Sequence, residues 1–510
     1  MKQRLLIFLF AITLTGFADY ACAEIQVIEN EKYTFTVSPY LRADVITLNN
    51  NIDLDNHIKD DSTAYIGFDY SLGFDFICKE SSMELFLKLE RNGPYGYGAP
   101  LFIHNTLYTS VTKVDSYRND ELLPQITELW ADVPVFDLPL KIKSGLYAYE
   151  AGNGLSLGGA YENYGLSLVY DAGEKLKFEF YYCRPDLARK SYLGERPGQD
   201  KEQGIDYQDT VGNFFALDSN IALDRHTIQP YVGVLIDNTG QARASNFSAP
   251  VKNDLLGTFG VSWAADLDKI SFNFEAARNF GRAESSDDAF GDVEHAGYAV
   301  YTNASYAYGD FSPHAQFIYA SGNKVTAEMV DNGDPVLTGG KNSAFSVYSP
   351  LNTNLSDSIY PGYTGISRPL VAMGSGYGLN YGIARPGSYY DPYLLENIIL
   401  SGLGFEWAPT EKISFIFDWW YFMAAEEGVG VYNGSARKLS CDLGNEIDAS
   451  CAYVFNDSVS LSLSGGYFFP GRFYKEERSD DTGSLFTPFI RGDGKADGAY
   501  QIELSLSLSY

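Results

Sequence analysis

Hydrophobic and polar residues alternate with a period of two along most of this chain. The last eleven residues, YQIELSLSLSY, place Tyr, Ile or Leu at every second position and Gln, Glu or Ser between them. Similar runs occur at 66–76, 176–182, 413–421 and 459–469. Such a period sends successive side chains to opposite faces of a β-strand. A run of about ten residues is long enough to cross the apolar band of an outer membrane, whereas strands of soluble sheets typically have about five or six residues.

The links between these runs alternate between short and long. The short links contain turn residues such as Asp, Gly, Pro and Asn, and they lie at 78–82, 136–139, 171–174, 223–225, 266–268, 309–310, 409–411 and 456–457. The long links lie near 48–62, 91–122, 151–159, 184–211, 237–253, 280–295, 321–396, 424–440 and 470–498. Eight short and nine long links join eighteen strands, with sixteen as the alternative count.

The pattern predicts an all-β fold, a transmembrane antiparallel up-and-down β-barrel of about 18 strands with short periplasmic turns and long extracellular loops. A soluble sheet with one wet face would show the same alternation. Aromatic residues gather at the strand ends, however, as the interfacial girdles of a membrane barrel require. We therefore expect residues 24–510 to form a single barrel domain.

The N-terminus differs from the rest of the chain. A basic start and the apolar run 5–18 precede small residues at 21–23. This order is typical of a secretory signal peptide, and the apolar run is too short to span a membrane as a helix. Residues 1–23 are therefore expected to be removed, which leaves Glu24 first; lipidation at Cys22 is the alternative.

Composition narrows the classes of function. Asp and Glu number 66 against 37 Lys and Arg, which gives a net charge of −29. Phosphates would repel so acidic a chain, which argues against nucleic-acid binding. The five histidines belong to no G-x-S-x-G or H-E-x-x-H motif, and the cysteine spacings match no zinc pattern. We expect no catalysis, metal or cofactor.

Position along the strands assigns a set of charged side chains to the lumen wall. The basic ones are Arg42, Lys88, Lys141, Lys143, Lys175, Lys177 and Lys412. The acidic ones are Asp44, Asp69, Asp75, Glu84, Glu128, Asp132, Glu179, Glu275, Asp418, Glu446, Asp448 and Glu503. Twelve acidic groups against seven basic ones should not attract a polyanion. Loop arginines could still fold inward and form a local basic ring; the candidates are Arg184, Arg189, Arg368 and Arg385.

Two pairs of lysines are candidates for a selectivity site. They are Lys141 with Lys143, and Lys175 with Lys177. Paired ammonium groups on a wall bind sulfate or carboxylate groups. The favoured alternative is that they pair with acidic neighbours and only neutralise buried charge; those neighbours are Glu128, Asp132 and Glu179. Tyr147 and Tyr149 are expected to continue the strand above Lys143.

The longest link, 321–396, is rich in Gly, Pro, Ser, Tyr and Asn. A structureless loop of this length is uncommon and usually functional. Two interpretations stand. The loop either covers the barrel mouth or folds inward and narrows the pore.

The stretch 439–474 reads LSCDLGNEIDASCAYVFNDSVSLSLSGGYFFPGRFY. It resembles the C-terminal region of the alginate-export family of outer-membrane barrels, in which a Leu-Gly-x-Glu-Ile-Asp strand is paired with a hairpin that ends in Tyr/Phe-Phe-Pro-Gly. The matching positions are Leu443, Gly444, Glu446, Ile447, Asp448, Phe468, Phe469, Pro470 and Gly471.

The resemblance implies a monomeric channel of the bacterial outer membrane that passes an acidic polysaccharide outward through a basic lumen. The acidic wall departs from that expectation. Three functions therefore stand: polysaccharide export of the alginate type, a general or cation-preferring diffusion porin, and a surface receptor or adhesion barrel. Expected partners are outer-membrane lipid and lipopolysaccharide, an anionic polysaccharide or small solutes, periplasmic delivery proteins, and the barrel-assembly machinery, which would bind the C-terminal strand ending at Tyr510.

Overall fold

Antiparallel strands dominate the computed structural model. It describes residues 25–49, 63–91, 125–135, 138–157, 164–173, 175–184, 212–238, 251–286, 291–324, 340–345, 369, 397–432, 435–476 and 496–509. Within these residues, eighteen strands pair with their neighbours in a closed ring. They are β2 (Tyr33–Asn49), β3 (Thr63–Cys78), β4 (Met83–Arg91), β5 (Gln125–Pro134), β6 (Leu140–Leu146), β7 (Tyr164–Asp171), β8 (Leu176–Cys183), β9 (Asn213–Leu223), β10 (His226–Asp237), β11 (Val251–Leu267), β12 (Ile270–Ser285), β14 (Tyr298–Tyr306), β15 (Phe311–Ala320), β17 (Ile398–Thr410), β18 (Ile413–Met423), β21 (Asp442–Asn456), β22 (Val459–Pro470) and β23 (Ala499–Ser509).

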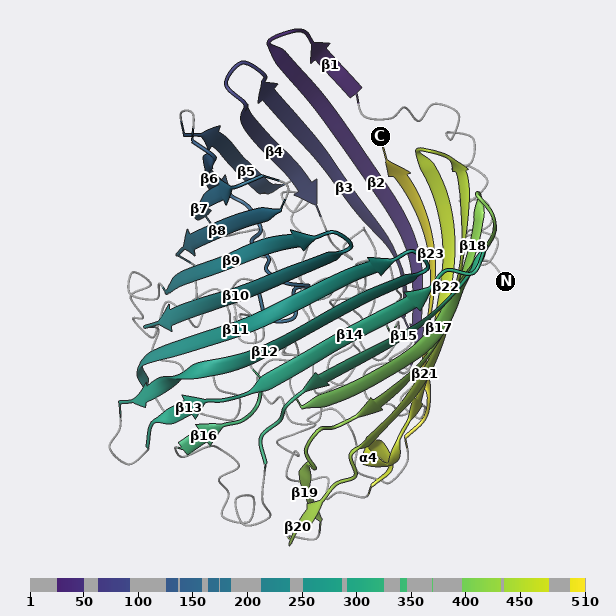
Figure 1. The fold of residues 1–510 in the computed structure, drawn as a ribbon. Coiled ribbons are helices and arrows are strands. Elements are labelled where there is room, and N and C mark those ends of the chain that lie inside the picture. The colour runs from purple at the N-terminus through teal and green to yellow at the C-terminus, as the bar shows by residue number, and fades with distance from the viewer. Residues whose placement is uncertain are drawn as a thin grey trace, which may run out of the picture.

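The barrel closes where the first of these strands meets the last. Residues Tyr40–Asn49 of β2 pair antiparallel with Tyr500–Ser509 of β23, and the purple and yellow strands lie side by side there (Figure 1). The prediction of a closed eighteen-strand barrel is confirmed. The alternative count of sixteen is wrong.

The alternation of side chains decides which face of each strand meets lipid. In β7, Leu166 and Leu168 point outward and are each 39% exposed, whereas Ser167 between them is fully buried. The same outward pattern recurs around the barrel, for example at Phe259 of β11 and Phe469 of β22. Apolar side chains exposed on the outside of a closed barrel are stable only in a lipid environment.

The links follow the predicted alternation. All eight short links join consecutive strands, namely β3–β4, β5–β6, β7–β8, β9–β10, β11–β12, β14–β15, β17–β18 and β21–β22. These turns use positive-φ residues where the chain reverses sharply, such as Asp224 at φ 55° and Asp268 at φ 59°. The nine long links join strand ends at the opposite end of the barrel.

Several shorter elements accompany the barrel. They are β1 (Ile25–Glu29), β13 (Val293–His295), β16 (Gly340–Asn342), β19 (Val429–Tyr432), β20 (Ser435–Lys438) and α4 (Arg472–Lys475). Strand β1 pairs with the start of β2, from Thr34 to Val37, where β23 has already ended. It therefore covers backbone groups that would otherwise form an open sheet edge. No helix in the described part of the chain is long and apolar enough to cross a membrane.

Candidate channel lumen

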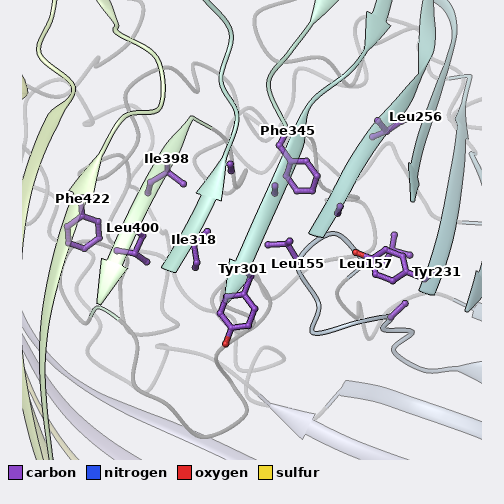
Figure 2. Packing of buried hydrophobic residues seen from close by; sticks show 14 of the residues in the cluster. Leu155, Leu157, Tyr231, Leu256, Tyr301, Ile318, Phe345, Ile398, Leu400 and Phe422 are labelled. Carbon is purple, nitrogen blue, oxygen red and sulfur yellow. The ribbon is translucent and has the colours of Figure 1, made fainter. Parts of the chain in front are cut away.

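The inward face of the barrel has two layers. Toward the short turns it carries mostly charged and polar side chains. Toward the long links it carries a cluster of buried apolar and aromatic side chains, with a few buried polar groups such as Asp254 and His295 beside it. Figure 2 shows part of this cluster, in which residues from different strands, such as Tyr301, Ile318 and Leu400, lie near one another. The polar layer holds most of the side chains that the sequence assigned to the lumen.

Five of the predicted basic residues lie on inward positions and most of them contact carboxylates. Arg42 Nε lies 2.8 Å from Asp44 Oδ1, and Arg42 Nη2 lies 2.5 Å from Glu503 Oε1. Lys88 Nζ lies 2.9 Å from Glu90 Oε2. Two further pairs follow the same rule: Lys141 Nζ with Asp132 Oδ2 at 3.3 Å, and Lys177 Nζ with Glu179 Oε2 at 3.5 Å.

Lys143 has different surroundings. Its ammonium group lies 3.9 Å from the centroid of the Trp130 ring and 4.5 Å from that of Tyr147. Trp130 in turn stacks on Phe86, with ring centroids 5.4 Å apart, and donates a hydrogen bond of 3.3 Å to Glu128 Oε2. A cation that lies over the face of an aromatic ring is attracted electrostatically by the quadrupole of that ring. Lys143 therefore sits in an aromatic cage on the wall formed by β4, β5 and β6.

Two of the predicted lumen lysines lie in turns instead. Lys175 occupies the turn before β8 and is exposed. Lys412 occupies the turn before β18, where its ammonium group donates to the carbonyl of Phe455 at 3.3 Å. The assignment of these two to the wall is wrong, because each alternating pattern began one residue before its strand does. Arg184 is exposed directly after β8. The side chain of Asp69, together with Arg189, Arg368 and Arg385, lies outside the described residues.

The predicted wall carboxylates face inward. Asp75, Glu84, Glu128, Asp132 and Glu179 line β3, β4, β5 and β8, and Asp44, Glu275, Asp418, Glu446, Asp448 and Glu503 are buried on the other strands. Asp418 Oδ1 lies 2.6 Å from His314 Nε2. Three more carboxylates are buried that were not predicted from the sequence, Asp218, Asp237 and Asp254. Asp254 lies 2.7 Å from His295 Nε2, and neither side chain is exposed. Each of these three aspartates has one apolar and one polar neighbour in the chain, so alternation alone does not mark it as inward-facing.

The segment after β6 departs most from expectation. Strand β6 ends at Leu146, so Tyr147 and Tyr149 do not continue it. Residues 147–157, which we call the inner segment, form a compact turn closed by a bridge between Ala151 and Leu157. Their apolar side chains belong to the cluster on the inward face (Figure 2). The expectation of an outer link at 151–159 is therefore wrong for its first part.

The long link 321–396 is described only in part. Strand β16 pairs parallel with β13, so that Gly340 lies opposite Val293. Phe345, which follows β16, is fully buried and joins the inward apolar cluster (Figure 2). Pro369 is buried as well. The remainder of this link, where the pore-narrowing role was expected, lies outside the described residues.

The residues of the family motif pair across one hairpin. Gly444 of β21 lies opposite Pro470 of β22, Glu446 opposite Phe468, and Ile447 opposite Tyr467. Gly444 has φ 127°, and a Cβ there would lie 2.2 Å from the Phe469 carbonyl oxygen. Leu443 and Phe468 are fully buried, whereas Phe469 is 47% exposed to the outside. Gly471 contacts Asp442 so closely that a Cβ would lie 2.4 Å from its carbonyl oxygen. The glycines of the motif therefore allow close backbone contact at this end of the hairpin.

The described residues contain no group of three or more His, Cys, Asp and Glu placed to hold a metal ion. What the interior offers is a hydrogen-bonding wall of paired charges beside an apolar cluster. Such a wall can guide a polar solute by charge and hydrogen bonding.

The chain was compared with solved structures and with curated protein sequences. Among solved structures, Pseudomonas aeruginosa OpdO is similar at 11% identity and a TM-score of 0.48, with 93% of this chain and 97% of that chain covered. Pseudomonas aeruginosa OccK11 (OpdR) gives 11% identity and a TM-score of 0.45 over 93% and 96%. Acinetobacter baumannii OccAB3 gives 8% and 0.46 over 93% and 99%. No curated protein sequence matched.

The chain also matches the sequence model of a protein family. The family described as "Alginate export" matches residues 194–487, which is more than half of the chain and includes the hairpin of β21 and β22. Together with the closed barrel and its apolar outer face, this match shows that the chain is an outer-membrane β-barrel of the bacterial alginate export family.

Proposed function

We propose that this protein is a passive channel that carries a polysaccharide across the outer membrane without catalysing a reaction. The observation that carries the proposal is the family match over residues 194–487. The family is one of transport barrels, and an eighteen-strand barrel is wide enough to leave room for a solute beside inward-folded segments.

The inward charges support a hydroxyl-rich solute rather than a strongly anionic one. Ammonium and carboxylate groups that are already paired, as in Lys141 with Asp132, still offer donors and acceptors to sugar hydroxyls. Such pairs attract a polyanion only weakly, because their charges cancel at a distance. The cargo we propose is therefore a polysaccharide of low charge density, delivered from the periplasm by a partner protein.

A second function is favoured by one specific observation. Over the described inward positions, carboxylates outnumber basic groups, and many of the carboxylates are buried among the strands. A wall with this excess concentrates cations. On this ground a cation-preferring diffusion porin for small solutes is the alternative proposal.

Planar bilayer recordings of the purified protein distinguish these functions. Under a salt gradient, the reversal potential reports ion preference. Neutral glucans and uronate oligomers of equal length are then added to the periplasmic side. Block of the current by the neutral oligosaccharide supports our proposal, and stronger block by the uronate oligomer indicates an alginate-like cargo. Strong cation preference without block by either sugar supports the diffusion porin. A channel without any current contradicts both and leaves the receptor or adhesion barrel.

A further inference from the structure

The inner segment, residues 147–157, contacts the inward faces of five strands, β7, β8, β9, β10 and β12. Tyr147 donates to Ser167 of β7 at 2.8 Å, and Ser167 donates to Glu179 of β8 at 2.6 Å. Tyr149 donates to Asp218 of β9 at 2.8 Å. These contacts place the segment inside the barrel rather than above its rim.

Aromatic packing adds to the polar contacts. The rings of Tyr149 and Tyr181 are stacked, with centroids 4.4 Å apart and an angle of 3° between their planes. Leu157 lies against β10, because a Cβ on Gly233 would come within 3.0 Å of its side chain. Ala151 and Leu157 are fully buried. The inner segment is therefore packed against the inward face of the barrel wall.

The far end of the segment is held by one carboxylate. Glu275 of β12 is fully buried. It accepts a hydrogen bond of 2.5 Å from the backbone N–H of Asn153, a second from the backbone N–H of Leu155, and one of 2.5 Å from the hydroxyl of Tyr231. The Tyr231 hydroxyl also lies 2.8 Å from Ser156 Oγ. A buried carboxylate is stable only where such donors replace water.

Gly152 makes this contact sterically demanding. Its φ of 71° lies in the left-handed region, and a Cβ would lie 2.8 Å from the Glu275 carboxylate. Glycine therefore serves two needs at this position. It permits the turn, and it allows the backbone to approach the carboxylate closely.

We propose that the inner segment is the constriction that sets the size limit of the channel, and that Glu275 is the positioning residue that holds it across the lumen. This inference rests on the proposed channel function. It concerns pore width alone, so it does not depend on which solute passes. Glu275 supplies the acceptor for the backbone N–H groups of Asn153 and Leu155, so its replacement removes or weakens both hydrogen bonds.

The test is single-channel recording of the full-length protein carrying Glu275→Gln. The amide retains one acceptor oxygen but turns an N–H₂ group toward backbone donors. We expect events of larger conductance to become about tenfold more frequent than in the unaltered protein, a factor that corresponds to ~1.4 kcal/mol. In proteoliposomes, the rate of swelling with a trisaccharide should rise relative to that with a monosaccharide.

Two further variants make the result decisive. Gly152→Ala alters the segment and leaves the barrel wall intact, so it should reproduce the effect even if Glu275→Gln reduces the yield of folded barrel. Glu80→Gln removes a carboxylate from the exposed turn between β3 and β4 and should leave the frequency of large events unchanged. Equal event frequencies and equal swelling ratios in Gly152→Ala and the unaltered protein would overturn the proposal.

The outcome remains distinct from that of the proposed function. Widening in Gly152→Ala without block by any oligosaccharide supports the constriction and contradicts polysaccharide transport. If the unaltered protein passes no current, a current that appears only in the Gly152→Ala or Glu275→Gln variants supports the constriction, and silence in both overturns it.

Discussion

Arg42 on the first barrel strand and Glu503 on the last are joined by an ion pair of 2.5 Å across the line where the barrel closes. The Arg42 guanidinium also contacts Asp44 at 2.8 Å and Ser505 Oγ at 3.3 Å. The closure of β2 on β23 is thus supported by charged side chains as well as by backbone hydrogen bonds.

Removal of this pair should weaken the closed barrel. Glu503→Ala leaves the arginine with one fewer carboxylate in a largely buried place, and we expect a loss of about 1–3 kcal/mol in the free energy of unfolding. Urea titration of the protein in lipid vesicles measures this loss. Glu503→Gln, which retains an acceptor oxygen, should lose less. Equal stability of the alanine variant and the unaltered protein would show that the pair contributes nothing to closure.

Gly145 should tolerate no side chain. It lies in β6 with φ 138°, and a Cβ there would come within 2.1 Å of the Leu129 carbonyl oxygen. Gly145→Ala should therefore cost about 2–3 kcal/mol or more through strain and displacement of β5. The fraction of protein that migrates as folded barrel in unheated gels reports the effect.

Gly73 of β3 is the matched control for that substitution. A Cβ there would meet nothing nearer than 3.6 Å, an ordinary contact with Ser38. Gly73→Ala should fold as well as the unaltered protein. Similar folded fractions for the two alanine variants would contradict the role given to Gly145.

Lys143 should contribute to ion preference from its aromatic cage. Lys143→Gln removes a positive charge from the inward wall, so the ratio of cation to anion permeability should rise about two- to fivefold, which corresponds to ~0.5–1 kcal/mol. The reversal potential under a salt gradient measures it. Lys412→Gln serves as the control, because Lys412 lies in a turn and contacts the Phe455 carbonyl. An unchanged potential in Lys143→Gln would place this lysine away from the ion path.

Cys441, which lies between β20 and β21 outside the barrel strands, should react slowly with alkylating reagents. Burial raises the pKa of its thiol, and the carboxylates of Glu427 and Glu426 raise it further. Because the thiolate is the reactive form, alkylation at pH 8 should be slower than for a free cysteine and should accelerate as the pH rises. Peptide mass spectrometry follows the rate at this residue.

Glu427→Gln provides the complementary measurement on Cys441. Glu427 forms an ion pair with Lys438, so its replacement removes a negative charge near the thiol and leaves a positive one. The pKa of Cys441 should fall and its alkylation at pH 8 should accelerate. A rate independent of this substitution would exclude an electrostatic cause.

The sequence by itself predicted about eighteen strands, the face of each strand that meets lipid, and the alternation of short and long links. These features are local: a period of two needs only neighbouring residues, and turn residues such as Asp224 fix reversals within a few positions. The same local pattern correctly predicted most of the charged side chains that face inward. It failed at Lys175 and Lys412, where alternation alone does not show the residue at which a strand begins.

The inner segment, the partners of the buried carboxylates and the parallel pairing of β13 with β16 were decided only by the tertiary structure. Asn153 and Glu275 are separated by 122 positions in the chain, yet their hydrogen bond holds a link inside the barrel. The alternating pattern carries no information on such a contact, because it depends on how distant strands are brought together when the sheet closes. For this protein, the sequence specifies the wall, and the closed barrel determines what lies across it.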